Sequence, residues 1–184
     1  LDRASDKSAY SELHGKVHPK FRTLLEERGY YDIFLADTQG NIIYSVFKEL
    51  DYATSVLKGE WRDSDLGAVF RHVMANGSSG SLSFTDFRPY APSADAPASF
   101  LASQVHSEDG KLIGALIFQM PIGEINAIMQ QQAGLGESGE SYIVGEDYLM
   151  RSDSRFSEDS TILKTKVETG TTKAGIAGKT GLAE

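Results

Sequence analysis

Several kinds of chemistry are excluded by residue types that the chain lacks. It contains no cysteine, which rules out disulfides, thiolate metal sites and cysteine nucleophiles. Basic residues are outnumbered, because 18 Lys and Arg stand against 26 Asp and Glu and give a formal net charge of −8. No basic cluster is present, so we expect no nucleic-acid partner, whose phosphates require clustered Lys and Arg.

Long apolar runs are missing as well. No stretch approaches the ~20 apolar residues that a membrane-spanning helix needs, and the chain contains no signal peptide. The chain begins with Leu1 rather than methionine, and we expect it to be a piece of a longer protein with membrane segments outside it. Its 184 residues, 40% of them hydrophobic, suffice for one domain, or for one domain and part of another.

Residues 30–49 are the most informative stretch and predict a β-hairpin. The first half alternates apolar side chains, and the second half is a dense run of β-branched and aromatic residues. The polar residues 37–41 between them indicate a turn.

Residues 6–28, before the hairpin, indicate a helix. Their apolar residues recur at helical spacing and form one stripe: Tyr10, Leu13, Val17, Phe21, Leu24 and Leu25. Asp6 is a suitable N-cap and Gly29 a suitable stop. Pro19 disfavours helical geometry at His18, so either the helix kinks there or two helices meet.

The rest of the chain predicts three further strands and two helices. Strands are expected at residues 81–87, 99–107 and 111–120, and helices from Asp63 or Ser64 to about residue 75 and at residues 122–132. Residues 88–98 hold three prolines and are expected to be a loop. The fold class is therefore α+β, with a PAS-like, five-stranded antiparallel sheet and a long N-terminal helix.

The sequence changes character after residue 132. A glycine-rich linker at residues 133–140 leads to a possible second hairpin, at residues 141–145 and 148–152, and then to a polar tail that cannot build its own core. We expect three parts: an N-terminal helical segment at 1–29, a sheet domain at 30–132, and a linker with the truncated start of a second module at 133–184.

Three patterns suggest catalysis or cofactor binding, but each stands in the wrong context. His14 and His18 have metal-ligand spacing on a helix but lack the Glu of a zinc-protease motif, so surface or capping roles are expected. Ser45 and Lys48 match S-x-x-K on a strand rather than at a helix start. Residues 134–139 match G-x-G-x-x-G but follow a helix rather than a strand. We expect no cofactor, no bound metal and no catalytic residues.

Polar residues at the ends of the predicted strands are the candidate ligand-binding residues. Lys48 follows the second strand, Asp86 and Tyr90 follow the third, and Ser99 and Gln119 flank the fourth and fifth. Glu49 and Asp51, beside Lys48, and Arg88, beside Tyr90, belong to the same polar rim. A few polar groups above an apolar floor are what a small-molecule pocket requires. The alternative is that these side chains only satisfy loop amides and one another.

Four segments carry a resemblance to a known family: residues 6–56, 86–105, 113–129 and 134–156. Together they resemble the extracytoplasmic PDC/Cache sensor region of bacterial transmembrane receptors, and they cover nearly the whole chain. Such regions occur in methyl-accepting chemotaxis proteins, sensor histidine kinases and cyclases. The order of residues along the chain would place Asp86, Tyr90, Ser99 and Gln119 at pocket-like positions.

The resemblance implies a non-enzymatic, periplasmic sensor domain of an inner-membrane receptor, tethered by segments outside the chain and homodimeric in the full receptor. It would bind a small molecule and pass the signal through helix displacement. The Tyr/Arg/Trp/Asp pattern of amino-acid-binding members is not found, so an amino acid is not favoured over a carboxylate or another metabolite. The alternatives are a module that binds a periplasmic partner protein and, less favoured, a metal-dependent hydrolase using His14 and His18.

Overall fold

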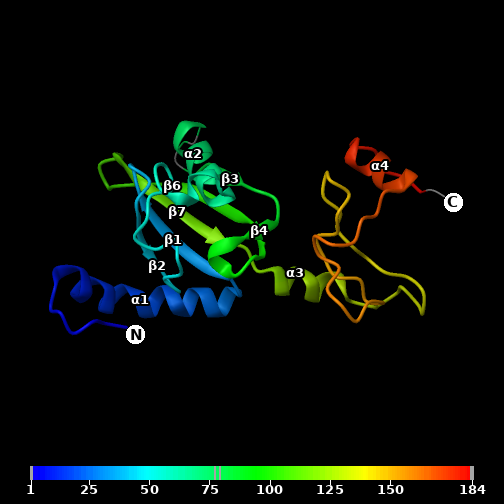
Figure 1. The fold of residues 1–184 in the computed structure, drawn as a ribbon, viewed down its shortest axis with the longest axis horizontal. Coiled ribbons are helices and arrows are strands. Elements are labelled where there is room, and N and C mark those ends of the chain that lie inside the picture. Colours follow the sequence, from blue (N-terminus) through cyan, green and yellow to red (C-terminus); the bar gives the residue numbers. More distant parts are fainter. Residues whose placement is uncertain (1, 77, 79, 183–184) are drawn as a thin grey trace.

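A computed structural model describes residues 2–76, 78 and 80–182. Within them, five strands form one antiparallel sheet in the order β2-β1-β7-β6-β3, which confirms the predicted fold class (Figure 1). The strands are β1 (Asp32–Asp37), β2 (Ile42–Ser45), β3 (Leu82–Phe84), β6 (Phe100–His106) and β7 (Leu112–Gln119), and β4 (Arg88–Tyr90) pairs separately with β5 (Ala96–Ala98). The helices are α1 (Ala9–Arg28), α2 (Asp65–Asn76), α3 (Ile122–Met129) and α4 (Gly170–Ile176), with the short 3-10 turns η1 (Glu60–Asp63) and η2 (Ala91–Ser93).

The β1–β2 hairpin forms where the sequence predicts it. The Asp37 carboxylate accepts the backbone N–H groups of Gln39 and Asn41 and so holds the turn. β1 then pairs along its whole length with β7, and Asp32 stands directly opposite Gln119 in that register. Two polar residues therefore face each other at one end of the sheet.

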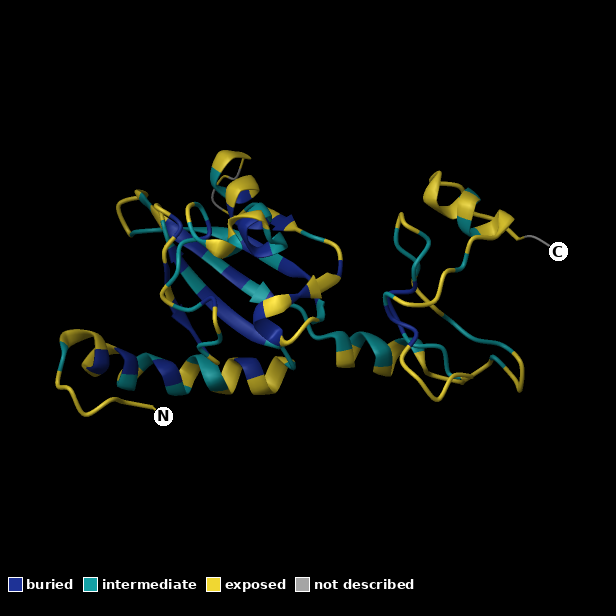
Figure 2. Ribbon diagram, viewed as in Figure 1, coloured by how far each residue is buried: buried dark blue, intermediate teal, exposed yellow. Residues whose placement is uncertain are grey.

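The main core lies between the sheet and α2. Ser64 caps α2, whose residues Leu66, Val69, Phe70 and Val73 are buried against the sheet. Phe34 and Phe100 meet edge-on beneath them, with ring centroids 6.3 Å apart. Figure 2 shows this buried layer in dark blue between the exposed surfaces. Periodic apolar residues thus produce the layer that sequence patterning predicts.

Helix α1 covers part of the opposite face, and it does so with different residues from those predicted. The buried positions are Ser11, His14, His18 and Leu25, whereas Leu13 is 61% exposed. The stripe is displaced by about one residue from the predicted one, so the expectation of surface or capping histidines is wrong. Each ring has a partner at Nδ1, the Asp2 carbonyl for His14 and the Tyr44 hydroxyl for His18, which lowers the cost of burying it.

Helix α1 is continuous, so the predicted meeting of two helices is not observed. Pro19 lies inside it, and Gly29 ends it in the left-handed conformation with φ 68°. Ser8 rather than Asp6 is the N-cap, because its side chain accepts the backbone N–H of Ser11.

The proline-rich residues 88–98 are more regular than the predicted loop. β4 and β5 form a two-stranded ribbon in which Pro89 stands opposite Pro97, and η2 closes it. A ribbon outside the main sheet can contain proline because it has free edges where no N–H is needed. We call residues 91–95, at the tip of this ribbon, the flap.

The C-terminal part, after α3, has little regular structure. The predicted hairpin at residues 141–152 is reduced to one isolated bridge between Val144 and Met150. Met150 and Ile162 are buried, while α4 and its surroundings are largely exposed (Figure 2). The polar tail does contain one helix, α4, because Thr169 and Thr172 form a capping box at its start.

In the described part of the chain, no helix combines the length and the apolar character that crossing a membrane requires.

Phe100 tests where the core lies. Phe100→Ala should lower the free energy of unfolding by about 3–5 kcal/mol, because a fully buried ring is replaced by a cavity. Phe84→Ala is the matched control: its ring is 60% exposed on edge strand β3, and we expect a loss below about 1 kcal/mol. Urea denaturation of both variants measures the difference, and equal losses would contradict this assignment of the core.

Candidate functional site

A buried group of polar side chains lies on the α2 face of the sheet, where β1 begins and β7 ends. We call it the acid cluster; its members are Asp32, Glu49, Asp51, Tyr90, Ser93 and Gln119. Asp32, Tyr90 and Gln119 lie on strands. Glu49 and Asp51 lie in the loop after β2, and Ser93 comes from the flap. Asp32, Asp51, Tyr90, Ser93 and Gln119 are each no more than 4% exposed.

Tyr90 and Asp51 form the centre of the acid cluster. The Tyr90 hydroxyl donates a hydrogen bond of 2.7 Å to Asp51 Oδ2. The Tyr90 ring packs edge-on against Phe100, with centroids 5.0 Å apart. Burial, together with the Asp51 carboxylate, raises the pKa of Tyr90, which is therefore a neutral donor. The Tyr90 side chain thus contacts the apolar core with its ring and the polar acid cluster with its hydroxyl.

The flap closes the acid cluster through Ser93. Its hydroxyl donates to Glu49 Oε2 at 2.7 Å and accepts from Gln119 Nε2 at 3.3 Å. The next two flap residues, Ala94 and Asp95, have φ values of 53° and 58°, in the left-handed region that non-glycine residues rarely occupy. The two hydrogen bonds of Ser93 therefore hold the flap against the acid cluster, and the backbone at Ala94 and Asp95 is locally strained.

Three oxygens of the acid cluster remain unpaired. Among the described residues, Asp32 Oδ2, Asp51 Oδ1 and Gln119 Oε1 are buried without a hydrogen-bond partner. A buried acceptor without a donor costs roughly 1–3 kcal/mol. Three such acceptors in one group indicate a place built to receive donors.

Asp32 is also a structural residue. Its Oδ1 accepts the backbone N–H groups of Ile33, Val46 and Phe47 at 2.7, 2.9 and 3.3 Å. The bonds to Val46 and Phe47 fix the chain directly after β2. Burial raises the pKa of Asp32 to about 7, although these amides lower it in part.

Asp51 lies in a similar environment. Burial raises its pKa; the hydrogen bond from Tyr90 opposes that rise and the Glu49 charge adds to it. The acid cluster therefore holds carboxyl groups whose ionised forms are costly until a positive charge approaches them.

A surface groove leads to the edge of the acid cluster. It has a volume of about 570 Å³ and is lined mainly by apolar groups, including Tyr30, Phe47 and Pro121. Tyr31 and Glu49 also line it, and the Tyr31 hydroxyl donates to Glu49 Oε1 at 3.1 Å. Glu49 thus belongs both to the groove and to the buried cluster.

Of the five residues predicted for the site, the structure brings Tyr90 and Gln119 together. Ser99 is fully buried but donates its hydroxyl to the Thr85 carbonyl at 2.7 Å. Lys48 Nζ donates to the Ser45 carbonyl at 2.9 Å and lies 5.1 Å from the centre of the Tyr44 ring. These two side chains therefore satisfy neighbouring groups outside the acid cluster.

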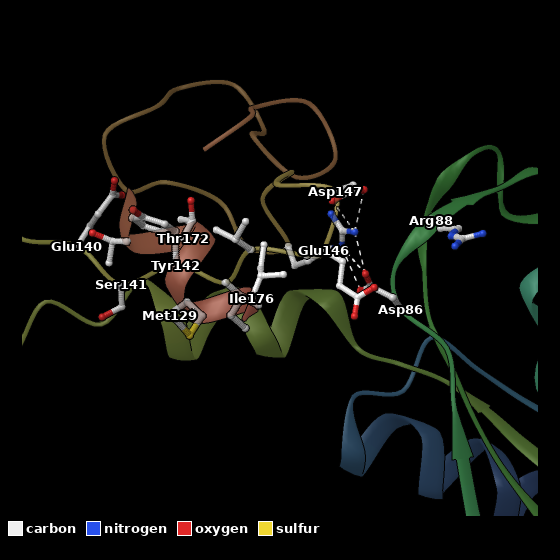
Figure 3. Close-up of a pocket in the computed structure, with 16 residues that line it drawn as sticks. Asp86, Arg88, Met129, Glu140, Ser141, Tyr142, Glu146, Asp147, Thr172 and Ile176 are labelled. Carbon is white, nitrogen blue, oxygen red and sulfur yellow. Dashed lines mark hydrogen bonds and ion pairs between the residues drawn. The ribbon is translucent and has the colours of Figure 1, made fainter. Parts of the chain in front are cut away.

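The fifth predicted residue, Asp86, lies in a second cleft, beside the C-terminal part (Figure 3). Arg151, whose side chain is only 6% exposed, donates from Nε to Asp86 Oδ1 at 3.0 Å and from Nη2 to Asp86 Oδ2 at 2.8 Å. Arg151 also bonds Asp147 at 3.0 Å and the Leu149 carbonyl at 2.9 Å. Gly145 makes room for it, because a Cβ there would lie 2.2 Å from Nη2.

This second cleft joins the sheet domain to the C-terminal part. It is open, has a volume of about 1320 Å³, and is lined by residues from both sides, among them Arg88, Met129 and Ile176 (Figure 3). The bidentate contact between Asp86 and Arg151 is the strong polar link across it. Its donors are already engaged, so we treat it as a joint rather than as a ligand site.

Sequence reasoning missed two members of the acid cluster, Asp32 and Ser93. It placed Glu49 and Asp51 at the rim of the sheet but did not select them as ligand-binding residues. Asp32 offered one signal, since it is a carboxylate at the start of an otherwise apolar strand. Glu49 and Asp51 stand beside the predicted Lys48, but only the path of the loop determines which of these side chains points inward.

Comparisons with known proteins agree with this architecture. The protein named probable chemoreceptor y4sI, from Sinorhizobium fredii, is 29% identical over 151 residues; the match covers 82% of this chain but only 19% of that protein. No protein-family model matches the chain.

Two solved structures show the same fold. One is the ligand-binding domain of the amino acid chemoreceptor PctC of Pseudomonas aeruginosa PAO1, in complex with GABA. It has a TM-score of 0.52 and 15% identity, and the match covers 90% of this chain and 64% of that one. The other is the extracellular domain of rpHK1S-Z16, described as a putative histidine kinase. It has a TM-score of 0.55 and 16% identity, and the match covers 73% of this chain and 52% of that one. The predicted resemblance to PDC/Cache sensor domains is therefore confirmed at the level of the fold.

The raised pKa of Asp32 predicts a particular pH dependence. A carboxyl whose pKa is higher in the folded than in the unfolded state stabilises the fold fully at low pH and loses that contribution as pH rises, here between about pH 4 and about pH 7. Asp32→Asn keeps an oxygen for the amides but cannot ionise. Relative to the wild type, its free energy of unfolding should therefore rise across this window by up to about 4 kcal/mol.

Urea denaturation at several pH values measures this difference. Asp37→Asn is the control, because Asp37 is a half-buried carboxylate at the turn: burial raises its pKa, but hydrogen bonds from Asn41 and neighbouring amides lower it by more. The Asp37 variant should show no comparable gain between about pH 4 and about pH 7. A constant difference between Asp32→Asn and the wild type would contradict the assignment.

Proposed function

We propose that this chain is the extracytoplasmic ligand-sensing domain of a bacterial inner-membrane receptor and that its ligand is a small molecule with a protonated amine. The observation that carries this proposal is the set of three unpaired, buried acceptor oxygens in the acid cluster. The relatives named above are sensor domains, which supports a sensing role.

The chemistry of the acid cluster matches an ammonium group. An ammonium group has three N–H donors and no acceptor, and Asp32 Oδ2, Asp51 Oδ1 and Gln119 Oε1 are three acceptors. Its positive charge would also favour ionisation of Asp32 and Asp51, because burial raises the pKa of both carboxyls. None of the six cluster residues is basic, so a ligand carboxylate would have only neutral donors there.

The groove beside Glu49 suits the remainder of such a ligand. Its apolar lining would hold a short hydrocarbon chain, while the ammonium group reaches past Glu49 under the flap. Opening requires loss of the two Ser93 hydrogen bonds. PctC was solved with GABA, which also joins an amine to a short chain.

A chain of contacts leads from the acid cluster to α1. Asp32 holds the backbone of Val46 and Phe47, just after β2. Tyr44 of β2 bonds His18 of α1 on the other face, with 2.8 Å between Tyr44 Oη and His18 Nδ1. Charge neutralisation at Asp32 would shift β2 and with it α1. We infer that helix displacement passes the signal across the membrane in a homodimeric receptor, a population shift set by differential affinity.

A module that binds a periplasmic partner protein is the second candidate. One observation favours it: Tyr90 and the flap fill the space above the sheet, so the acid cluster is closed. A metal-dependent hydrolase is not supported, because no group of three or more His, Asp or Glu side chains in the described residues could hold a metal ion.

A matched set of three compounds tests the ligand class. GABA carries an amine and a carboxylate, butylamine only the amine, and butyrate only the carboxylate. We expect the amine-bearing compounds to raise the melting temperature in a thermal-shift assay, with about 2.7 kcal/mol of stabilisation at a hundredfold excess over Kd. Butyrate should have no effect.

Two variants locate the binding. Asp51→Asn should weaken amine binding at least about tenfold, since it removes a charge-assisted hydrogen bond. Asp109→Asn, in the exposed turn before β7, should bind as the wild type does. If a broad amine panel gives no shift, the proposal fails and the partner-protein alternative gains support. If butyrate alone stabilises the domain, the amine proposal fails and a carboxylate ligand is indicated instead.

A further inference from the structure

Two histidines are stacked in the contact between α1 and the sheet. The rings of His14 and His18 lie nearly parallel, with centroids 4.4 Å apart and an interplanar angle of 22°. They are only 7% and 4% exposed. Tyr44 of β2 packs beside both, at centroid distances of 5.7 and 6.0 Å. The ligand-sensing proposal gives the pair no role beyond the His18–Tyr44 contact.

The hydrogen bonds of the pair suit neutral rings. His14 Nδ1 lies 2.8 Å from the Asp2 carbonyl oxygen, which can only accept, so Nδ1 carries the proton. His14 Nε2 then has a bare lone pair, and it is buried without a hydrogen-bond partner among the described residues. Protonation would place an N–H donor and a positive charge at this position without an acceptor, which is costly.

The charges around the pair also oppose protonation. Arg22 of α1 and Lys48, after β2, are both positive. Asp2 is the negative group beside them, and its carboxylate is already paired with Arg22. Tyr10 and Tyr44 complete the surroundings and are neutral, since burial raises the pKa of each. A proton added to the His18 ring would therefore meet more positive than negative charge.

We propose that this stacked pair makes the docking of α1 on the sheet dependent on pH, with acidification favouring a detached helix. Detachment exposes both rings to water and removes the cost of protonating His18, while the α2 core does not involve α1. The proposal does not need a ligand, so it stands or fails separately from the acid cluster.

The direction of the pH effect on α1 docking, and the pH range in which it occurs, follow from the linkage between proton binding and docking. Burial, followed by the charges of Lys48 and the neighbouring His14, lowers the pKa of His18 to about 4, whereas a solvated histidine titrates near ~6.5. The detached state therefore binds more protons between these values, and docking weakens as pH falls through that window. From about pH 7.5 to about pH 5, one such histidine raises the ratio of detached to docked helix about 30-fold.

Hydrogen exchange of the wild-type chain, corrected for intrinsic rates, tests this at about pH 7.5 and about pH 5. Protection of α1 peptides should fall by tenfold or more, while peptides of β1 and β7 keep theirs. The double variant His14→Gln/His18→Gln should lose this pH dependence, and His72→Gln, an exposed histidine on α2, should retain it.

Two outcomes would overturn the proposal: equal pH dependence in α1 and the sheet, or a double variant that responds to pH as the wild type does. An NMR titration of the wild-type histidines covers the case in which the double variant does not fold. A His18 pKa near the ordinary ~6.5 would equally overturn the proposal.

Discussion

The buried carboxylate of Asp32 is the constraint on which both the fold and the site depend. One of its oxygens accepts three backbone N–H groups and fixes where β2 ends relative to β1. The other oxygen is unpaired and belongs to the acid cluster. A ligand that changed the charge at Asp32 would therefore act on the same carboxylate that positions β2, and binding would be coupled to backbone geometry.

The two faces of the sheet carry different chemistry. The α2 face combines an apolar core with the acid cluster, whereas the α1 face holds two stacked histidines against Tyr44. Strand β2 lies at the sheet edge and contacts both systems. The link between Asp86 and Arg151 ties the ribbon that carries Tyr90 to the C-terminal part. The acid cluster is thus connected to α1 through Asp32 and β2, and to the C-terminal part through the ribbon and Asp86.

Much of the fold could be predicted because it follows from local patterns. Residue type and spacing predict the five strands of the sheet, the cap of α2 at Ser64 and the end of α1 at Gly29. The buried face of α1 could not be read in this way, because stacked histidines replace the apolar residues that periodicity selects. The ribbon of β4 and β5 was also missed, since proline content argues for a loop wherever no partner strand is known.

The sequence by itself determined the fold class of the protein: an acidic, cysteine-free α+β domain whose apolar periodicities specify its sheet and most of its helices. Only the tertiary structure decided which polar residues meet. Tyr90 and Gln119 join Asp32 and Asp51, while Lys48 and Asp86 satisfy neighbours elsewhere. The physical reason is that secondary structure depends on neighbours along the chain, whereas the direction of a rim side chain depends on loop paths and on partners far away in sequence.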